Sequence, residues 1–293
     1  MRSSTSDRPG SPTFALIGLA RVVHPFPSSL DAIAAAGIAL VAGGSPEMAV
    51  RLALGMLGCQ FAIGAANDFA DADADSVGNP HKPIPEGRLS RGAVAGIALV
   101  TAAWGVTVVA TVSWAVLIVA GLGLADGLLY DFRLKATPLA WAPFAAGVGL
   151  LPLYAWVGVR GSAPPALLGI AAAAALAGAA LALANAYADL DRDVVSGVRS
   201  VAVFLGARWT LRVNAALHAV VQLIAAATII VTVPRPEWVL AEVAGCVLVW
   251  LGLSLTVLKD VCVRGLVWQV QAVGIAVLGI GWLAGLNAAG FLK

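Results

Sequence analysis

The chain has 293 residues, of which 60% are hydrophobic and only 12% are charged, and its formal net charge is +2. Soluble globular domains carry roughly 25% charged residues, so this composition excludes an ordinary soluble protein. The small net charge also argues against a nucleic-acid partner. Apolar runs of about 20 residues have the length of a membrane-spanning helix. We therefore expect an all-α integral membrane protein.

Taken in order, the chain divides into a polar N-terminal segment, residues 1–27, and a single transmembrane domain, residues 28–293. The apolar runs predict about nine transmembrane helices in one bundle. The expected spans lie at about 28–44, 47–69, 91–109, 113–131, 138–158, 165–189, 211–232, 238–258 and 265–290.

Lysine and arginine are unevenly distributed over the expected loops. If the N-terminus is cytoplasmic and the chain crosses nine times, fourteen of the 18 basic residues lie on the cytoplasmic side and four lie outside. Cytoplasmic loops are enriched in these residues. We therefore expect a cytoplasmic N-terminus, which also puts the two acidic motifs described next on the cytoplasmic side.

The second expected span ends in a stretch that is rich in carboxylates, Asn67-Asp68-Phe69-Ala70-Asp71-Ala72-Asp73-Ala74-Asp75. Asn67, Asp71 and Asp75 are spaced by four residues and share one face of a helix. Like charges on that face repel unless a cation lies between them. Carboxylates suit hard divalent cations such as Mg²⁺, Mn²⁺ or Ca²⁺. The stretch therefore predicts a divalent metal site.

A matching stretch ends the sixth expected span. Four of its polar residues lie 118 positions after a counterpart, pairing Asn67 with Asn185, Asp71 with Asp189, Asp73 with Asp191 and Asp75 with Asp193. The alternative is two unrelated, solvated helix ends. The repeat instead favours two pseudo-repeated halves around a central cavity, with one shared site. Asp73 and Asp191 lie off the common face, so we interpret them as solvated or supporting groups.

Basic side chains accompany both acidic stretches. Lys82 and Arg88 lie in an expected loop, about 71–90, Lys135 follows the fourth span, and Arg199 follows the second acidic stretch. Mg²⁺ in proteins is usually bound by a few carboxylates plus substrate phosphates, and two metals can clamp a leaving oxygen. The pattern therefore predicts a substrate with a diphosphate head and an isoprenoid tail. Positive-inside bias is an equal explanation for any one of these basic residues.

Asp126 lies inside the fourth expected span, one turn before Tyr130, and both should face the same side. Ionisable residues within spans are functional candidates. We expect Asp126 to contact an acceptor or to remove its proton. The alternative is a buried acid that is hydrogen-bonded to a neighbouring helix.

These motifs resemble those of the UbiA superfamily of intramembrane prenyltransferases. Asn67-Asp68-x-x-Asp71-x-x-x-Asp75 looks like the first signature of that family, and Asp189-x-x-x-Asp193 looks like the second. Further similarity lies in the loop Lys82 to Ser90, in Tyr130 with Leu134-Lys135, and in Gly197, Arg199 and Gly206. The chain departs from the family at Lys82, where arginine is common, and at Ala136, where a basic residue is frequent.

The resemblance implies that a Mg²⁺-bound prenyl diphosphate lies between the two motifs and alkylates a hydrophobic, usually aromatic, acceptor. On this chain Asn67, Asp68, Asp71 and Asp75 would bind one Mg²⁺, and Asp189 and Asp193 the other with help from Asn185. The groups expected to act on the departing diphosphate or on the acceptor are Lys82, Arg88, Lys135, Arg199, Tyr130 and Asp126.

Two other functions fit the same sequence. A terpene cyclase would ionise the same diphosphate without an acceptor. A membrane transporter is the non-enzymatic alternative, because internal repeats are common in transporters. Prenyl chain length, acceptor and oligomeric state do not follow from the sequence.

Overall fold

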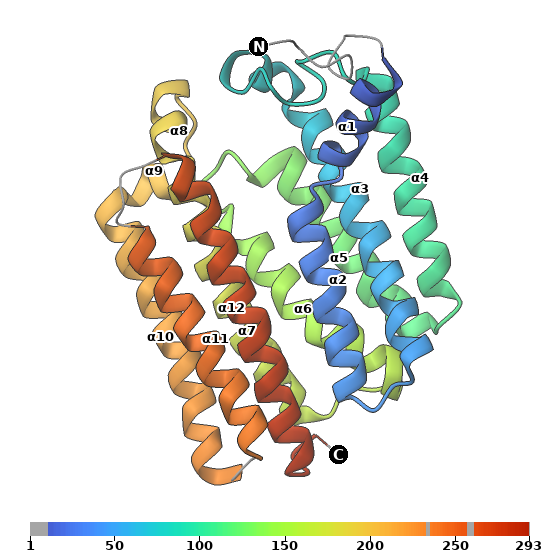
Figure 1. Ribbon diagram of the computed structural model, residues 1–293, viewed down its shortest axis with the longest axis vertical. Coiled ribbons are helices and arrows are strands. Elements are labelled where there is room, and N and C mark those ends of the chain that lie inside the picture. The colour runs from blue at the N-terminus through green and yellow to red at the C-terminus, as the bar shows by residue number, and fades with distance from the viewer. Residues whose placement is uncertain (1–10, 233–234, 257–260, 293) are drawn as a thin grey trace.

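The structure is a computed structural model that describes residues 11–232, 235–256 and 261–292. Every regular element of this part of the chain is a helix (Figure 1). In chain order they are α1 (Pro12–Val22), α2 (Pro25–Val41), α3 (Pro46–Gly78), α4 (Arg91–Ala110), α5 (Trp114–Leu129), the π-helical turn η2 (Tyr130–Leu134), α6 (Trp141–Arg160), α7 (Pro165–Ala188), α8 (Leu190–Ser196), α9 (Val201–Leu205), α10 (Ala207–Thr232), α11 (Pro236–Leu255) and α12 (Val261–Ala288).

Eight of the described helices are long and apolar enough to cross a membrane. The 17-residue α2 is shorter, but it packs against α3, α6 and α12 as part of the same bundle (Figure 1). With α2 included, the helices correspond one to one with the nine expected spans. The expectation of an all-α membrane bundle of about nine helices is therefore confirmed.

Serine caps set the start of three of the long helices. The hydroxyl oxygens of Ser45, Ser90 and Ser113 accept hydrogen bonds from backbone N–H groups of the first turns of α3, α4 and α5, at 3.2, 3.1 and 3.3 Å. Such caps satisfy amide groups that a helix leaves without an internal partner. The Ser113 cap begins α5 three residues after α4 ends, so the third and fourth spans are separated by a very short connection.

The acidic stretches differ from the expected boundaries. The helix α3 continues through the whole first stretch to Gly78, so the loop expected from about residue 71 begins only at residue 79. Alternating alanines favour this extension, because alanine is the best helix former. The second stretch instead contains a break, since α7 ends at Ala188 and α8 begins at Leu190. The two halves are therefore similar but not equivalent.

The helix α2 closes one side of the bundle against α12. The ring of Phe26 meets that of Trp268 edge to face at a centroid distance of 5.6 Å. At the other end of the pair, the amide of Asn287 donates a hydrogen bond of 2.8 Å to the carbonyl of Val41. These contacts join α2, near the start of the chain, to α12, the last helix. The bundle thus closes around a central space.

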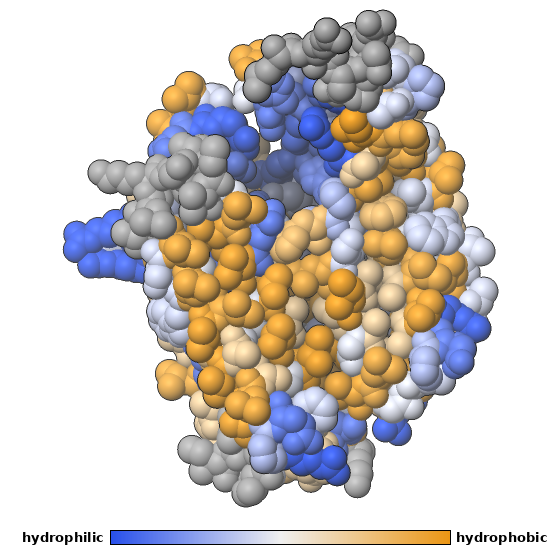
Figure 2. Space-filling view, in the orientation of Figure 1, coloured by the Kyte–Doolittle hydropathy of each residue, from blue (hydrophilic) through white to orange (hydrophobic). Residues whose placement is uncertain are grey.

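The surface of the bundle is that of a membrane protein. Figure 2 shows hydrophobic residues across the middle of the visible face, with hydrophilic residues gathered toward both ends. In this view the upper end is hollowed by a recess with hydrophilic walls. The helices α1, α8 and α9 lie at this same end (Figure 1).

Candidate active site

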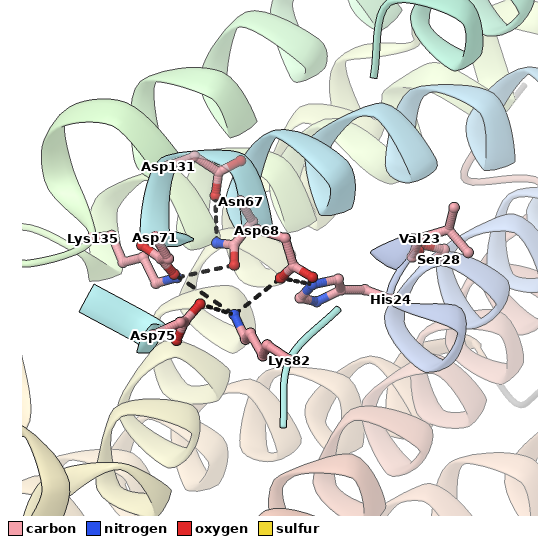
Figure 3. Close-up of polar contacts among 10 residues, drawn as sticks. All are labelled: Val23, His24, Ser28, Asn67, Asp68, Asp71, Asp75, Lys82, Asp131 and Lys135. Atoms are coloured by element: carbon pink, nitrogen blue, oxygen red, sulfur yellow. Dashed lines mark hydrogen bonds and ion pairs between the residues drawn. The ribbon is translucent and has the colours of Figure 1, made fainter. Parts of the chain in front are cut away.

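Three carboxylates of α3 converge on one lysine from the following loop (Figure 3). The Nζ atom of Lys82 lies 3.0 Å from Asp68 Oδ1, 3.0 Å from Asp75 Oδ2 and 3.8 Å from Asp71 Oδ2. Residues three, four and seven apart lie on one helical face. The first acidic motif therefore presents three of its carboxylates to a single cationic point, and Asp68 takes part although the predicted face is that of Asn67, Asp71 and Asp75.

The charge of Lys82 is favoured by this setting. Burial lowers the pKa of its ammonium group, but the carboxylates of Asp68 and Asp75 outweigh burial and raise the pKa above its ordinary value. Lys82 is therefore a permanent cation at neutral pH.

A second lysine reaches the same motif from the other side. Lys135 Nζ forms an ion pair with Asp71 and donates a hydrogen bond of 3.0 Å to the side-chain oxygen of Asn67. The amide nitrogen of Asn67 in turn donates a hydrogen bond of 2.7 Å to Asp131 Oδ1. Asn67 is thus a bridge between a cation and a carboxylate (Figure 3).

The π-helical turn η2 positions this second set of groups. The backbone N–H of Lys135 bonds to the carbonyl of Tyr130 at 2.9 Å, five residues earlier. Single π-helical turns inside helices are frequent at functional sites. Here the turn directs Asp131 and Lys135 toward α3, while the ring of Tyr130 packs edge to face on Phe144 with a centroid distance of 5.4 Å.

His24 completes the first half of the site. It has φ +48°, in the left-handed region, although it is followed by Pro25. That conformation is unfavourable for a residue with a side chain, and such outliers cluster at functional sites. The imidazole Nε2 lies 2.9 Å from Asp68 Oδ1, and the Asp68 side chain is only 3% exposed.

The second acidic motif lies at the junction of α7 and α8. Asn185 is in the last turn of α7, Asp189 follows its end, and Asp193 is in α8; their positions bracket the break between the two helices. Asp189 Oδ2 forms an ion pair with Arg192 at 2.9 Å. Burial raises the pKa of Asp189, whereas Arg192, Lys135 and Lys82 favour its ionised form. Lysines of the first half thus act electrostatically on a carboxylate of the second.

Two of the expected phosphate-binding residues have other contacts. The guanidinium of Arg88 donates a hydrogen bond of 2.9 Å to Glu86 and lies 4.0 Å from the ring centroid of Phe14 on α1. Arg199 is exposed and lines a second pocket together with residues 136–138. The structure therefore brings Lys82 and Lys135 to the acidic motif, and places Arg88 between the loop and α1.

An elongated cavity begins at these polar groups and extends into the bundle. Its volume is about 320 Å³, and its walls are mostly apolar. His24, Asn67, Tyr130 and Asp131 line its polar end, and Trp282 with its apolar neighbours lines the interior. Asp126 also lines the cavity, so Asp126 and Tyr130 face the same space, as their spacing predicts.

The donor set suits Mg²⁺ bound together with a phosphate ligand. No three His, Cys, Asp or Glu side chains of the described ranges surround one point closely enough to form a metal site by themselves. Mg²⁺ needs fewer, because it is usually bound by one or two carboxylates plus substrate phosphates and water. The carboxylates of Asp68, Asp71 and Asp75 already share one positive charge, that of Lys82, at 3.0 to 3.8 Å, so the acidic motif favours a cation at this position.

Two members of this site, His24 and Asp131, are not predicted from the sequence, which places one in the polar N-terminal segment and the other in a short loop. Asp131 carries a usable signal, because it is next to Tyr130 at the end of an apolar span. His24 carries none beyond its position between Val23 and Pro25. Asp73, expected to be a solvated or supporting group, has a side chain that is 87% exposed and paired with Arg91.

Comparisons with known proteins show which family the chain resembles. The profile of the UbiA prenyltransferase family matches residues 32–262. Digeranylgeranylglyceryl phosphate synthase of Natronomonas pharaonis is 31% identical over 210 residues, which cover 68% of this chain and 72% of the relative.

Solved structures share the fold. The apo structure of a UbiA homolog from Aeropyrum pernix K1 has a TM-score of 0.72 at 20% identity, and the match covers 92% of this chain and 98% of that one. A UbiA homolog from Archaeoglobus fulgidus bound to GPP and Mg²⁺ has a TM-score of 0.68 at 19% identity, covering 89% and 99%. Family profile, sequence relative and fold lead to one conclusion: the chain belongs to the UbiA prenyltransferase family.

Proposed function

We propose that this prenyltransferase moves a prenyl group from an allylic prenyl diphosphate to a hydrophobic or aromatic acceptor within the membrane, and releases diphosphate. The observation that carries the proposal is a mostly apolar cavity whose polar end is lined by Asn67, next to the carboxylates of the first acidic motif and the two lysines that contact them. A charged head can stay at the polar end while a hydrocarbon tail occupies the interior.

The polar end would bind the diphosphate with Mg²⁺. Asn67, Asp68, Asp71 and Asp75 would bind one ion, and Asp189 and Asp193, with Asn185, the other. Mg²⁺ at these carboxylates would neutralise negative charge on the leaving diphosphate. The use of Mg²⁺ is supported by the donor set and by the ion bound in the Archaeoglobus fulgidus homolog.

Within the chain, Lys82 and Lys135 are the residues best placed to stabilise the departing diphosphate. Both ammonium groups already lie against the carboxylates that would bind the metal. Fixed positive charge aimed at a leaving group often lowers the reaction barrier more than any other single effect. Arg199 would act from the second half of the site, and Arg88 would act by holding α1 and the loop together.

The reaction exchanges one bond for another. The bond between the prenyl C1 atom and the diphosphate oxygen breaks, and its electron pair leaves with the diphosphate. A nucleophilic atom of the acceptor donates an electron pair to C1, and the acceptor then loses a proton. Asp126 lines the cavity and is the candidate proton acceptor, with Tyr130 between it and the motifs. The apolar walls would exclude water from the cationic C1.

The orientation follows from charge. The basic loops and both acidic motifs lie at the end of the bundle that carries α1, α8 and α9 (Figure 1). Because cytoplasmic loops are enriched in lysine and arginine, this end would face the cytoplasm, where a soluble diphosphate would be released.

The proposal is tested by diphosphate release from the purified protein with Mg²⁺ and a series of allylic diphosphates, each with and without a panel of acceptors. Release that requires both Mg²⁺ and an acceptor, and that is lost in Asp71→Ala and Asp189→Ala, is the expected result. Full activity in both variants would overturn the assignment of the site. Release without an acceptor, together with a cyclic product, would indicate a cyclase instead.

A further inference from the structure

A second polar pair lies deeper in the cavity wall. The amide nitrogen of Gln60 on α3 donates a hydrogen bond of 2.7 Å to Asp31 Oδ2 on α2, and both residues line the cavity. Asp31 is seven residues after His24, and Gln60 is seven before Asn67. With a rise of 1.5 Å per residue, the pair therefore lies about 10 Å further into the bundle than His24 and Asn67.

The pair offers hydrogen-bond acceptors to the cavity. A carboxyl group offers acceptor oxygens to a ligand, and a glutamine amide has one acceptor oxygen. Gln60 uses its N–H on Asp31 Oδ2. Asp31 Oδ1 and Gln60 Oε1 thus remain as acceptor atoms, and a ligand with an O–H group can donate to them.

The ionisable side chains that line the cavity are mostly acidic. The ionisable or basic side chains among its described lining residues are His24, Asp31, Asp126 and Asp131, together with Tyr130; lysine and arginine are absent from that set. The cations Lys82 and Lys135 lie at the mouth, against the acidic motif. An anionic group placed beyond the mouth would therefore meet carboxylates without a compensating cation, which costs free energy in a low-dielectric site.

A role in packing alone does not account for Asp31. Ionisable side chains within membrane helices are costly, and they usually face a cavity and mark a substrate path. An aliphatic residue would pack α2 against α3 at lower cost, and the pair instead directs acceptor oxygens into a space that is otherwise mostly apolar.

We propose that Asp31 and Gln60 bind a hydroxyl group of the prenyl acceptor, and that this acceptor is a neutral, hydroxyl-bearing molecule rather than a carboxylate or a phosphate. The inference rests on the proposed prenyl transfer and specifies its second substrate. The pair lies in the cavity wall about 10 Å from the mouth, so an acceptor bound there would lie beside the prenyl tail with its reacting atom toward C1. Asp31 is a positioning residue that selects the acceptor.

The test compares matched acceptors that differ by one group. One pair is a phenol and the same phenol with a ring carboxylate; the other is a long-chain glycerol ether and its phosphate. Prenylation by the full-length protein with Mg²⁺ gives kcat/KM for each, and equilibrium binding of each compound is measured separately. We expect the neutral member of at least one pair to be preferred by about tenfold or more, as one charge-assisted hydrogen bond would give.

The variant Asp31→Asn keeps the side-chain volume and replaces the carboxyl group with an amide. It should raise the KM for the neutral acceptor about tenfold. The ratio of kcat/KM between the neutral phenol and the phenol with a ring carboxylate should decrease. The KM for the prenyl diphosphate should stay unchanged. Glu242→Gln is the matched control, because Glu242 is a buried acid of α11 that lies outside the described cavity lining. It should match the wild type in every measurement.

The outcomes separate this inference from the proposed function. Equal or tighter binding of the carboxylate or phosphate member in both pairs would overturn the inference, even if prenyl transfer occurs. An Asp31→Asn variant with unchanged acceptor binding and unchanged discrimination would overturn it as well. If no acceptor is prenylated, the proposed function fails, while the binding preference for neutral compounds is still decided by the equilibrium measurement.

Discussion

The Nζ atom of Lys82 lies 3.0 Å from Oδ1 of Asp68, so a loop lysine is paired with a carboxylate that is almost completely buried. The same oxygen contacts the imidazole of His24 at 2.9 Å. Asp68 therefore connects the loop after α3 to the junction of α1 and α2. The acidic motif is held in place by its own chain before any substrate binds.

Replacing Lys82 with methionine should destabilise the protein and sensitise it to Mg²⁺. Three carboxylates would lose their common cation, and we expect a loss of about 2 kcal/mol, between the values for exposed and buried pairs. A divalent cation can replace the lost charge. Mg²⁺ should therefore raise the thermal midpoint of Lys82→Met in detergent by more than that of the wild type. An equal shift in both proteins would contradict this role of Lys82.

The contribution of Lys82 should be constant across neutral pH. Its pKa is raised above the ordinary value of 10.5. A raised lysine pKa stabilises the folded state at pH values below the ordinary pKa, and this stabilisation is lost only as the pH rises through the folded pKa. The difference in thermal midpoint between the wild type and Lys82→Met should therefore stay the same from about pH 6 to about pH 9. A difference that shrinks steadily over this range would show that Lys82 titrates there.

Neighbouring aspartates of the first motif should differ sharply in importance. Asp71 contacts both lysines, whereas the side chain of Asp73 is 87% exposed and pairs with Arg91. Asp71→Asn should reduce diphosphate release by about 100-fold or more, as the loss of a group that stabilises a leaving charge does. Asp73→Asn should keep nearly full activity, because exposed ion pairs contribute little. Comparable losses in both variants would mean that the total negative charge of the motif matters, and not the position of each carboxylate.

The bundle and the two motifs could be predicted from the sequence because each has a periodic signal. Apolar runs of membrane length define the spans, and a spacing of four puts Asn67, Asp71 and Asp75 on one helical face. The shared side of Asp126 and Tyr130 follows from their separation by one helical turn. These features are local, so a short stretch of sequence is enough to define them.

The partners of those residues could not be predicted, because they depend on tertiary packing. The contact of Asp131 with Asn67 requires a π-helical turn, whose hydrogen bond spans five residues and breaks the expected periodicity. Arg88 has the position expected of a phosphate-binding residue in the loop, yet it binds Glu86 and packs on Phe14. Spacing indicates where Arg88 lies along the chain but not which partner its side chain contacts.

The junction of α1 and α2 should tolerate no added volume at Gly64. A Cβ atom at this position of α3 would lie 3.1 Å from the carbonyl carbon of Val23 and 3.2 Å from the Cβ of His24. Gly64→Ala should therefore displace His24 from Asp68 and cost about 1–3 kcal/mol, as overpacking does. Gly96→Ala on α4 is the control, because a Cβ there meets nothing within 4 Å. A lower thermal midpoint is expected for Gly64→Ala alone, and equal midpoints would contradict the tight contact.

The side-chain amide of Asn67 should be required for activity, because it accepts one hydrogen bond and donates another. Its oxygen accepts from Lys135 at 3.0 Å, and its nitrogen donates to Asp131 at 2.7 Å. Asn67→Asp keeps the first contact but sets two carboxylates against each other, so we expect diphosphate release to fall by about tenfold or more.

Asp131→Asn in the same chain restores a donor and an acceptor to the pair, with the two groups exchanged. The double variant should therefore recover activity over Asn67→Asp alone, whereas two unrelated defects would add. Diphosphate release measured for the wild type, both single variants and the double variant decides between these outcomes, and a double variant that is no better than Asn67→Asp would show that the bridge between Lys135 and Asp131 is not what Asn67 provides.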